Sequence, residues 1–154
     1  SINFNNNRSL KLNVNYISTV GNFGARGDSA YSHSIVIDLA LNDCLSWVVQ
    51  NDYLRVGSTG EDNIGLNQYL FYELTDKVAV GSRMEWWKGD VQTGYAPHDA
   101  VLPKKGSLSY YAATLGVNYR PCCNFMCRPE VRHDWSPAAG YAVTYFGIDA
   151  VVTY

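Results

Sequence analysis

The segment from Asn124 to Tyr154 constrains the fold of this chain most strongly. Side chains along a β-strand point alternately to its two faces, so residues two apart share a face. The first half, NFMCRPEVRHDWS, alternates charged residues with apolar or aromatic ones, and the second half, YAVTYFGIDAVVTY, repeats the division. One face of the predicted hairpin is therefore charged and the other apolar, which is typical of strands between lipid and a polar lumen.

The same alternation recurs along the rest of the chain. Apolar and polar residues alternate in the segments 10–20, 31–41, 45–50, 64–74, 78–87 and 110–120. Asn51 and Asp52 blur the pattern and predict a bulge or an early strand end. No helical periodicity of comparable strength competes, so with the final hairpin we predict about eight long antiparallel strands.

The connections between these strands alternate in length. Short turns are predicted at Asn42, Thr75 and Pro121, and longer loops at 21–30, 57–63 and 88–106. In bacterial outer-membrane barrels, short turns face the periplasm and long loops face outside. The chain is therefore predicted to be all-β, a single antiparallel up-and-down transmembrane β-barrel domain over residues 1–154 or the C-terminal part of a larger barrel. The 88–106 loop is long enough to fold inward and narrow a channel.

The composition agrees with a barrel and excludes several other classes. The chain has 154 residues, of which 47% are hydrophobic and 17% charged, and no run approaches the roughly 18 apolar residues of a membrane helix. Its net charge of −2 predicts no nucleic-acid partner. There is no glycine-rich phosphate loop, and neither His98-Asp99 nor His133-Asp134 has a nucleophile beside it. We therefore predict no cofactor and no enzymatic activity.

Four cysteines fall in two places, Cys44 and the group Cys122, Cys123 and Cys127. A zinc site is not predicted, because no histidine lies at a ligand spacing on a second arm. A disulfide between Cys44 and either Cys122 or Cys123 is expected if the compartment is oxidising. Free thiols at a turn are the alternative.

Several segments resemble the OmpL-like outer-membrane β-barrel porins. They are GLNQYLFYELTDKVAVGSRMEWW from Gly65 onward, LGVNYRP, RPEVRHDW and the closing FGIDAVVTY. The first 60 residues share with these porins only the general pattern of alternation. The resemblance implies a barrel that conducts small polar solutes. The chain departs from the family pattern in its cysteines, in His133 where an aromatic is usual, and in its shorter length.

Charged residues at alternating positions are predicted to line the interior of the barrel. An ionised side chain facing hydrocarbon costs about 2 to 4 kcal/mol near the midplane, so these residues must face inward. In a narrow barrel they would interlock and close it, whereas in a wide barrel they would line water and set a local field. The predicted lumen-lining residues are Arg83, Glu85, Arg128, Glu130, Arg132, Asp134 and Asp149.

The function predicted from these features is passive diffusion of small polar solutes or ions across the bacterial outer membrane, with oligomers allowed. The expected partners are outer-membrane lipid and the barrel-assembly machinery, since Tyr154 resembles the terminal aromatic signal that this machinery reads. Two alternatives stay open: a closed structural or adhesive barrel with binding loops, and a soluble lipocalin-like barrel with its apolar face inward. A closed eight-stranded barrel requires the segment 10–20 to pair with 145–154.

Overall fold

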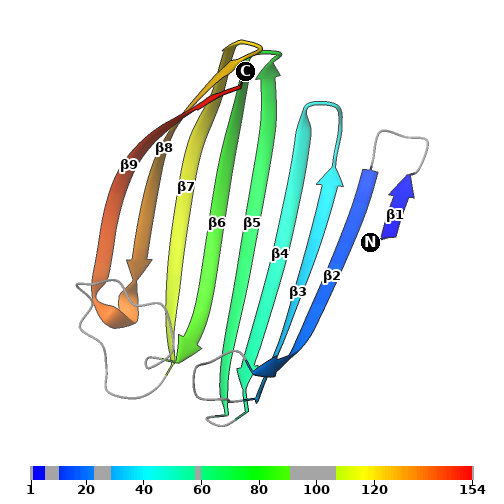
Figure 1. Cartoon of the computed structure of the whole chain (residues 1–154). Helices are drawn as coiled ribbons and strands as arrows, with labels where there is room; N and C mark the ends of the chain where they lie inside the picture. Colours follow the sequence, from blue (N-terminus) through cyan, green and yellow to red (C-terminus); the bar gives the residue numbers. More distant parts are fainter. Residues whose placement is uncertain (1, 6–10, 23–28, 58–59, 91–106, 154) are drawn as a thin grey trace.

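A single antiparallel sheet contains almost all of the described chain. The computed structural model describes residues 2–5, 11–22, 29–57, 60–90 and 107–153, whose strands pair in chain order (Figure 1). The strands are β1 (Ile2–Asn5), β2 (Lys11–Asn22), β3 (Ser29–Ala40), β4 (Leu45–Val56), β5 (Glu61–Thr75), β6 (Val78–Asp90), β7 (Ser107–Cys122), β8 (Phe125–Ser136) and β9 (Tyr141–Val152). The predicted all-β, up-and-down antiparallel fold is confirmed, with the short β1 preceding eight long strands.

Short turns form at the predicted positions. In the turns at Asn42 and Thr75, a side-chain oxygen accepts hydrogen bonds from backbone N–H groups that have left the strand pairing. The Asn42 Oδ1 atom accepts hydrogen bonds from the backbone N–H groups of Cys44 and Leu45, both at 2.9 Å. The Thr75 Oγ1 atom accepts from the N–H groups of Lys77 and Val78 at 3.2 and 3.1 Å. Such Asx and ST turns stabilise tight reversals. The β3–β4, β5–β6 and β7–β8 turns all lie at the end of the sheet where β9 finishes (Figure 1).

Some predicted boundaries are wrong by a few residues. The expected interruption at Asn51 and Asp52 is absent, because β4 pairs without a break with both β3 and β5. The Asn51 amide instead donates to the Gly65 carbonyl at 3.1 Å, which satisfies a polar side chain inside a regular strand. The register shifts lie between Glu73 and Thr75 and between Tyr119 and Cys122.

Two predicted loops are also shorter than expected. Strand β5 begins at Glu61 and β6 continues to Asp90, so both reach into segments predicted as loop. The break before β9 is a 3-10 helix, η1 (Pro137–Ala139), which ends at Gly140 in the left-handed conformation at φ 62°. The remainder of the long loop, 91–106, and Tyr154 lie outside the described residues.

The register divides the sheet into a polar face and an apolar face. Arg83 pairs with Thr114, Thr114 with Arg132, and Arg132 with Tyr145, so these four residues share one side, here called the polar face. The opposite side, here called the apolar face, carries many large exposed hydrophobic side chains, among them Leu70, Tyr72, Leu115, Phe146, Ile148 and Val152. A one-residue slip would exchange the two faces, so the alternation itself specifies the register.

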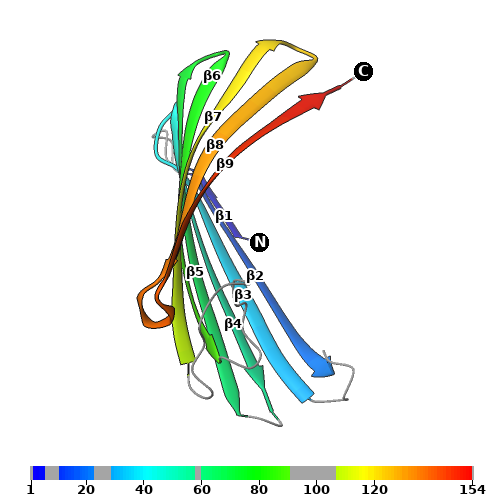
Figure 2. The same ribbon diagram turned by 90° about the vertical axis from the view of Figure 1, so that its left-hand side faces the viewer.

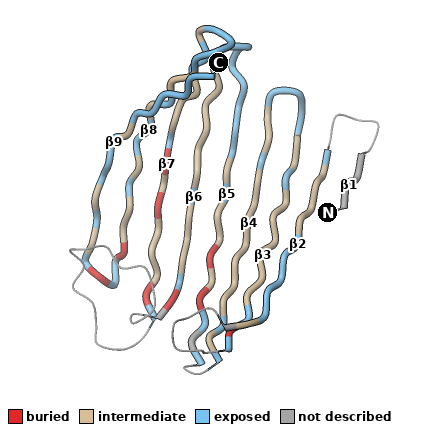
Figure 3. The backbone as a smooth tube through the Cα atoms, viewed as in Figure 1, coloured by how far each residue is buried: buried red, intermediate tan, exposed pale blue. Residues whose placement is uncertain are grey.

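The sheet has almost no buried core. Within the described residues, the only buried apolar side chains are small or isolated: Ala30, Leu108, Ala112 and Ala139 (Figure 3). Ile148 and Phe146 on the apolar face remain 65% and 75% exposed. An apolar surface of this extent needs a further apolar phase to cover it. No described helix is long and apolar enough to cross a membrane.

The sheet is a single curved and twisted layer whose two edges do not meet (Figure 2). Strand β2 pairs with β1 and β3, and β9 pairs with β8. Among the described residues, the pairing between segments 10–20 and 145–154 that a closed eight-stranded barrel requires is therefore not formed. The strands are nevertheless long enough for a bilayer, because 12 to 16 residues exceed the roughly 9 to 11 that a tilted transmembrane strand needs.

The predicted disulfide is not formed. All four cysteines are free thiols, and Cys44, Cys122 and Cys123 are exposed. Cys44 precedes β4 and Cys122 ends β7, so two complete strands separate them in the sheet. Three strand spacings amount to about 14 Å, whereas a disulfide needs Cα atoms within about 7 Å.

Candidate functional site

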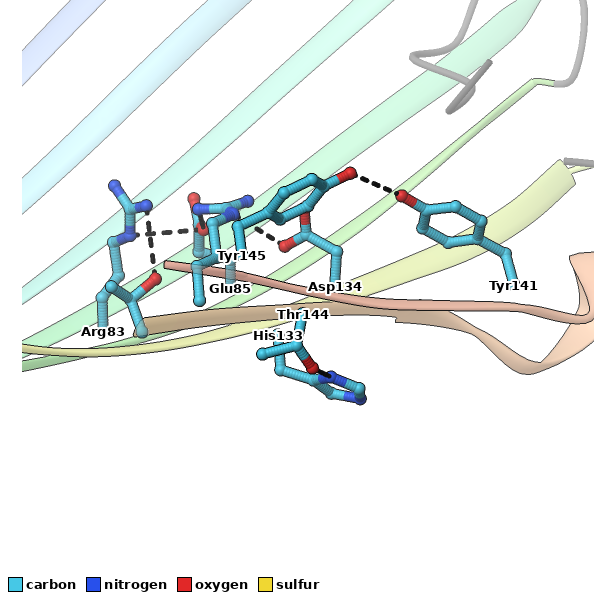
Figure 4. A network of polar contacts seen from close by, with 9 residues as sticks. Arg83, Glu85, His133, Asp134, Tyr141, Thr144 and Tyr145 are labelled. Atoms are coloured by element: carbon cyan, nitrogen blue, oxygen red, sulfur yellow. Dashed lines mark hydrogen bonds and ion pairs between the residues drawn. The ribbon is translucent and has the colours of Figure 1, made fainter. Parts of the chain in front are cut away.

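The centre of the polar face holds a network of ion pairs between β6 and β8 (Figure 4). The Arg132 guanidinium contacts Glu85 through Nη1 and Asp134 through Nε, the latter at 2.7 Å. Glu85 Oε2 also lies 3.3 Å from Arg83 Nε, and Arg83 Nη2 donates to the Thr114 hydroxyl at 3.5 Å. The two arginines and two carboxylates are half-buried, so their charges are neutralised within the network rather than by solvent alone.

Strand β7 makes this network possible because it presents small side chains between the charged strands. Glu85 pairs with Ala112 and Arg132 with Thr114, yet Glu85 and Arg132 meet across β7. Ala112 and Thr114 are buried, at 4% and 9% exposure, beneath the long side chains that cross them. A larger residue at either position would occupy the space through which the ion pair forms.

Replacing Ala112 by leucine should therefore separate Glu85 from Arg132. Overpacking of a filled site costs typically about 1 to 3 kcal/mol, and we expect a loss in this range for the free energy of folding into phospholipid vesicles, measured by urea titration. The control is Ala113→Leu, the next residue along β7, whose side chain lies on the apolar face beside Met84. Equal losses of folding free energy from the two variants would contradict the conclusion that the Glu85–Arg132 ion pair needs small side chains on β7.

A second ion pair lies nearer the short turns. Arg128 donates from Nε and Nη2 to the two carboxylate oxygens of Asp149, at 2.7 and 2.5 Å. This bidentate geometry is the strongest that an arginine and a carboxylate form, but both side chains are about half exposed and solvent weakens it. Glu130 lies between the two ion-paired groups and leans over Gly147, where an added Cβ would be 3.5 Å from its Cγ.

The structure places every predicted lumen-lining residue on the polar face. It brings Arg83, Glu85, Arg132 and Asp134 together, joins Arg128 to Asp149, and leaves Glu130 beside them. Among the hollows on this face, one surrounds the Arg132 network and another surrounds Arg128 and Asp149. The arrangement can present donors and acceptors of both signs to a polar solute. It holds no group of three or more potential metal ligands among the described residues.

The family comparison supplies the context for this face. Residues 1–150 match the family described as "Putative beta-barrel porin-2, OmpL-like". The chain belongs to this porin family. The match extends the resemblance noted from Gly65 onward to nearly the whole chain, including the N-terminal strands that share only a style of alternation with it. A comparison with curated proteins gave no match.

His133 lies among aromatic rings on the apolar face. Its ring stacks on Trp135 with centroids 5.5 Å apart, and Nδ1 lies 2.8 Å from the Thr144 hydroxyl (Figure 4). Trp135 in turn stacks on Tyr111 at 5.5 Å. Rings gathered near the loop end of an apolar face agree with the aromatic girdles of membrane barrels.

Aromatic residues on the polar face were not among the predicted site residues. Tyr69 and Phe71 lie side by side on β5 with ring centroids 6.2 Å apart and planes 13° from parallel. Trp87 and Tyr110 form a second pair at 5.8 Å. The signal available in the sequence was the position of these four rings in the polar phase of the alternation, where polar side chains are the rule.

Proposed function

We propose that this protein is an outer-membrane porin that allows passive diffusion of small polar solutes and ions. The observation that carries the proposal is the division of one sheet into two faces. The apolar face exposes large hydrophobic side chains that suit contact with lipid, while the polar face carries ion pairs and hollows. Membership of a porin family supports the same arrangement of lipid outside and solute inside. A soluble lipocalin-like barrel would need the apolar face to be the inner one.

We further propose that additional strands complete the barrel. The edges of the sheet, β1 and β9, each have one neighbour in the sheet. Exposed strand edges do not occur in the hydrocarbon region, because each unpaired backbone group there costs several kcal/mol. The missing strands come from further residues of the same protein or from neighbouring copies. Eight strands alone would close around an interior nearly filled by side chains, so extra strands also make room for a lumen.

Reconstitution into planar bilayers tests the proposal, and we expect stepwise increases in ionic current. Replacing both Arg128 and Arg132 by serine removes fixed positive charge from the polar face. The reversal potential in a salt gradient should then shift toward cations, because the barrier to them is lower.

The matched control for this pair is Arg128→Lys with Arg132→Lys, which retains both charges and should leave the preference nearly unchanged. The double serine variant should also conduct, so that a change in selectivity is measured rather than a loss of folding. Folded protein that inserts into bilayers without conducting would contradict the porin function and favour a closed structural or adhesive barrel.

A further inference from the structure

We propose that the hollow above β6 and β7 on the polar face is a binding subsite for the ring of a neutral sugar. The inference rests on the proposed porin function and names a class of solute that this wall of the pore would retain. The hollow is bounded by Tyr69 and Phe71 on one side and by Arg128, Glu130 and Asp149 on the other.

Glycines form the floor of this hollow and leave it open. Gly81 on β6 pairs with Gly116 on β7, and Gly116 with Glu130 on β8. A Cβ atom added at Gly81 would lie 3.1 and 3.2 Å from two ring carbons of Phe71, so this ring rests against the bare backbone. Glu130 leans away from Gly116 toward Gly147. Gly116 carries no side chain of its own, and the nearest side-chain atom to an added Cβ there is Glu130 Cβ at 3.3 Å, so a flat solute can approach this stretch of backbone closely.

The aromatic side of the hollow consists of two neighbouring rings on β5. The Tyr69 and Phe71 rings are nearly parallel, and Phe71 is 37% exposed. Aromatic faces offer a large apolar contact area at low cost in side-chain entropy, and binding sites combine such surfaces with a few placed polar groups. A sugar ring has the matching chemistry, with apolar C–H faces and a rim of hydroxyls.

The charges around the hollow favour a neutral solute over an ion of either sign. A cation above the two rings would also approach Arg83, which lines the same hollow, and an anion would approach Glu130 and Asp149. Sugar hydroxyls can donate to the carboxylates and accept from the guanidinium groups, and such charge-assisted bonds are stronger than neutral ones. Mixed charge therefore selects for hydroxyl-rich neutral rings.

Titration calorimetry on the full-length protein in detergent measures this binding without requiring a conducting pore. The probe is maltotriose, and sorbitol, which has hydroxyls but no ring, is the matched comparison. We expect saturable heat with maltotriose and none with sorbitol. Equal heats from the two compounds, or no saturable heat from maltotriose with folded protein, would overturn the proposal.

Two variants locate the site. Tyr69→Ala combined with Phe71→Ala should weaken maltotriose binding about tenfold, because both apolar ring surfaces of the site are removed. Gly116→Leu should abolish binding by filling the floor, at a position where a Cβ would meet Glu130 Cβ at 3.3 Å. The control is Tyr72→Ala, on the apolar face of β5, which should bind maltotriose as the unmodified protein does.

Unchanged affinity in both the double alanine and the Gly116→Leu variants would contradict the assignment of the hollow. The bilayer measurement separates this inference from the porin function. A protein that conducts ions but does not bind maltotriose overturns the sugar subsite alone, whereas one that binds maltotriose without conducting retains the subsite and loses the pore.

Discussion

Replacing Phe146 by arginine should lower the free energy of folding into phospholipid vesicles by about 2 to 4 kcal/mol, the cost of a cationic side chain on the lipid side of a barrel near the midplane. Phe146 lies in the middle of β9 on the apolar face and is 75% exposed, so no neighbouring side chain can shield the new charge. Urea titration of folding, followed by tryptophan fluorescence, measures the loss. This change is expected to have the largest effect of all those considered.

The matched control for this substitution is Gly147→Arg, one residue further along β9. The side chain at position 147 points to the polar face, where Gly147 pairs with Glu130. A guanidinium there gains an acidic neighbour, and an added Cβ has ordinary contact distances to the Glu130 side chain. The folding free energy should therefore change by well under 1 kcal/mol, as for an exposed ion pair. A similar loss from both substitutions would contradict the assignment of the two faces to lipid and lumen.

Removing Glu85 should also produce a large effect, a loss of about 1 to 3 kcal/mol in folding free energy for Glu85→Ala. Glu85 is the shared partner of Arg83 and Arg132, and its side chain is 24% exposed. Without it, Arg83 loses its ion-pair partner and keeps the hydrogen bond to Thr114, while Arg132 keeps Asp134. The same urea titration measures the loss, and the excess positive charge should also shift ion selectivity toward anions in planar bilayers.

The Arg128–Asp149 pair provides the comparison, because it has better geometry but more solvent. Its side chains are 45% and 54% exposed, and exposed ion pairs contribute about 0 to 1 kcal/mol. Asp149→Ala should therefore cost less than Glu85→Ala, and raising the salt concentration should reduce its small effect further. A larger loss for Asp149→Ala would show that burial is not what gives the central network its strength.

Much of the candidate site could be predicted because strand geometry is strictly periodic. Once Arg128, Arg132 and Asp134 fall in one phase of an extended segment, they must share a face, whatever surrounds them. The partners could not be predicted in the same way. The contact between Glu85 and Arg132 depends on the register of two separate pairings and on small side chains at Ala112 and Thr114 between them. Neither register is encoded at any single position.

The sequence by itself determined the strand type, the two faces, the short turns and the family, because each of these depends on local alternation and on residues close together in the chain. Only the tertiary structure decided the open edges at β1 and β9, the separation of Cys44 from Cys122 by two strands, and the hollow above Gly81 and Gly116. These depend on how many strands lie between residues distant in sequence and on which way side chains lean. Alternation along one strand carries no information about the number of intervening strands or about the direction in which a side chain leans.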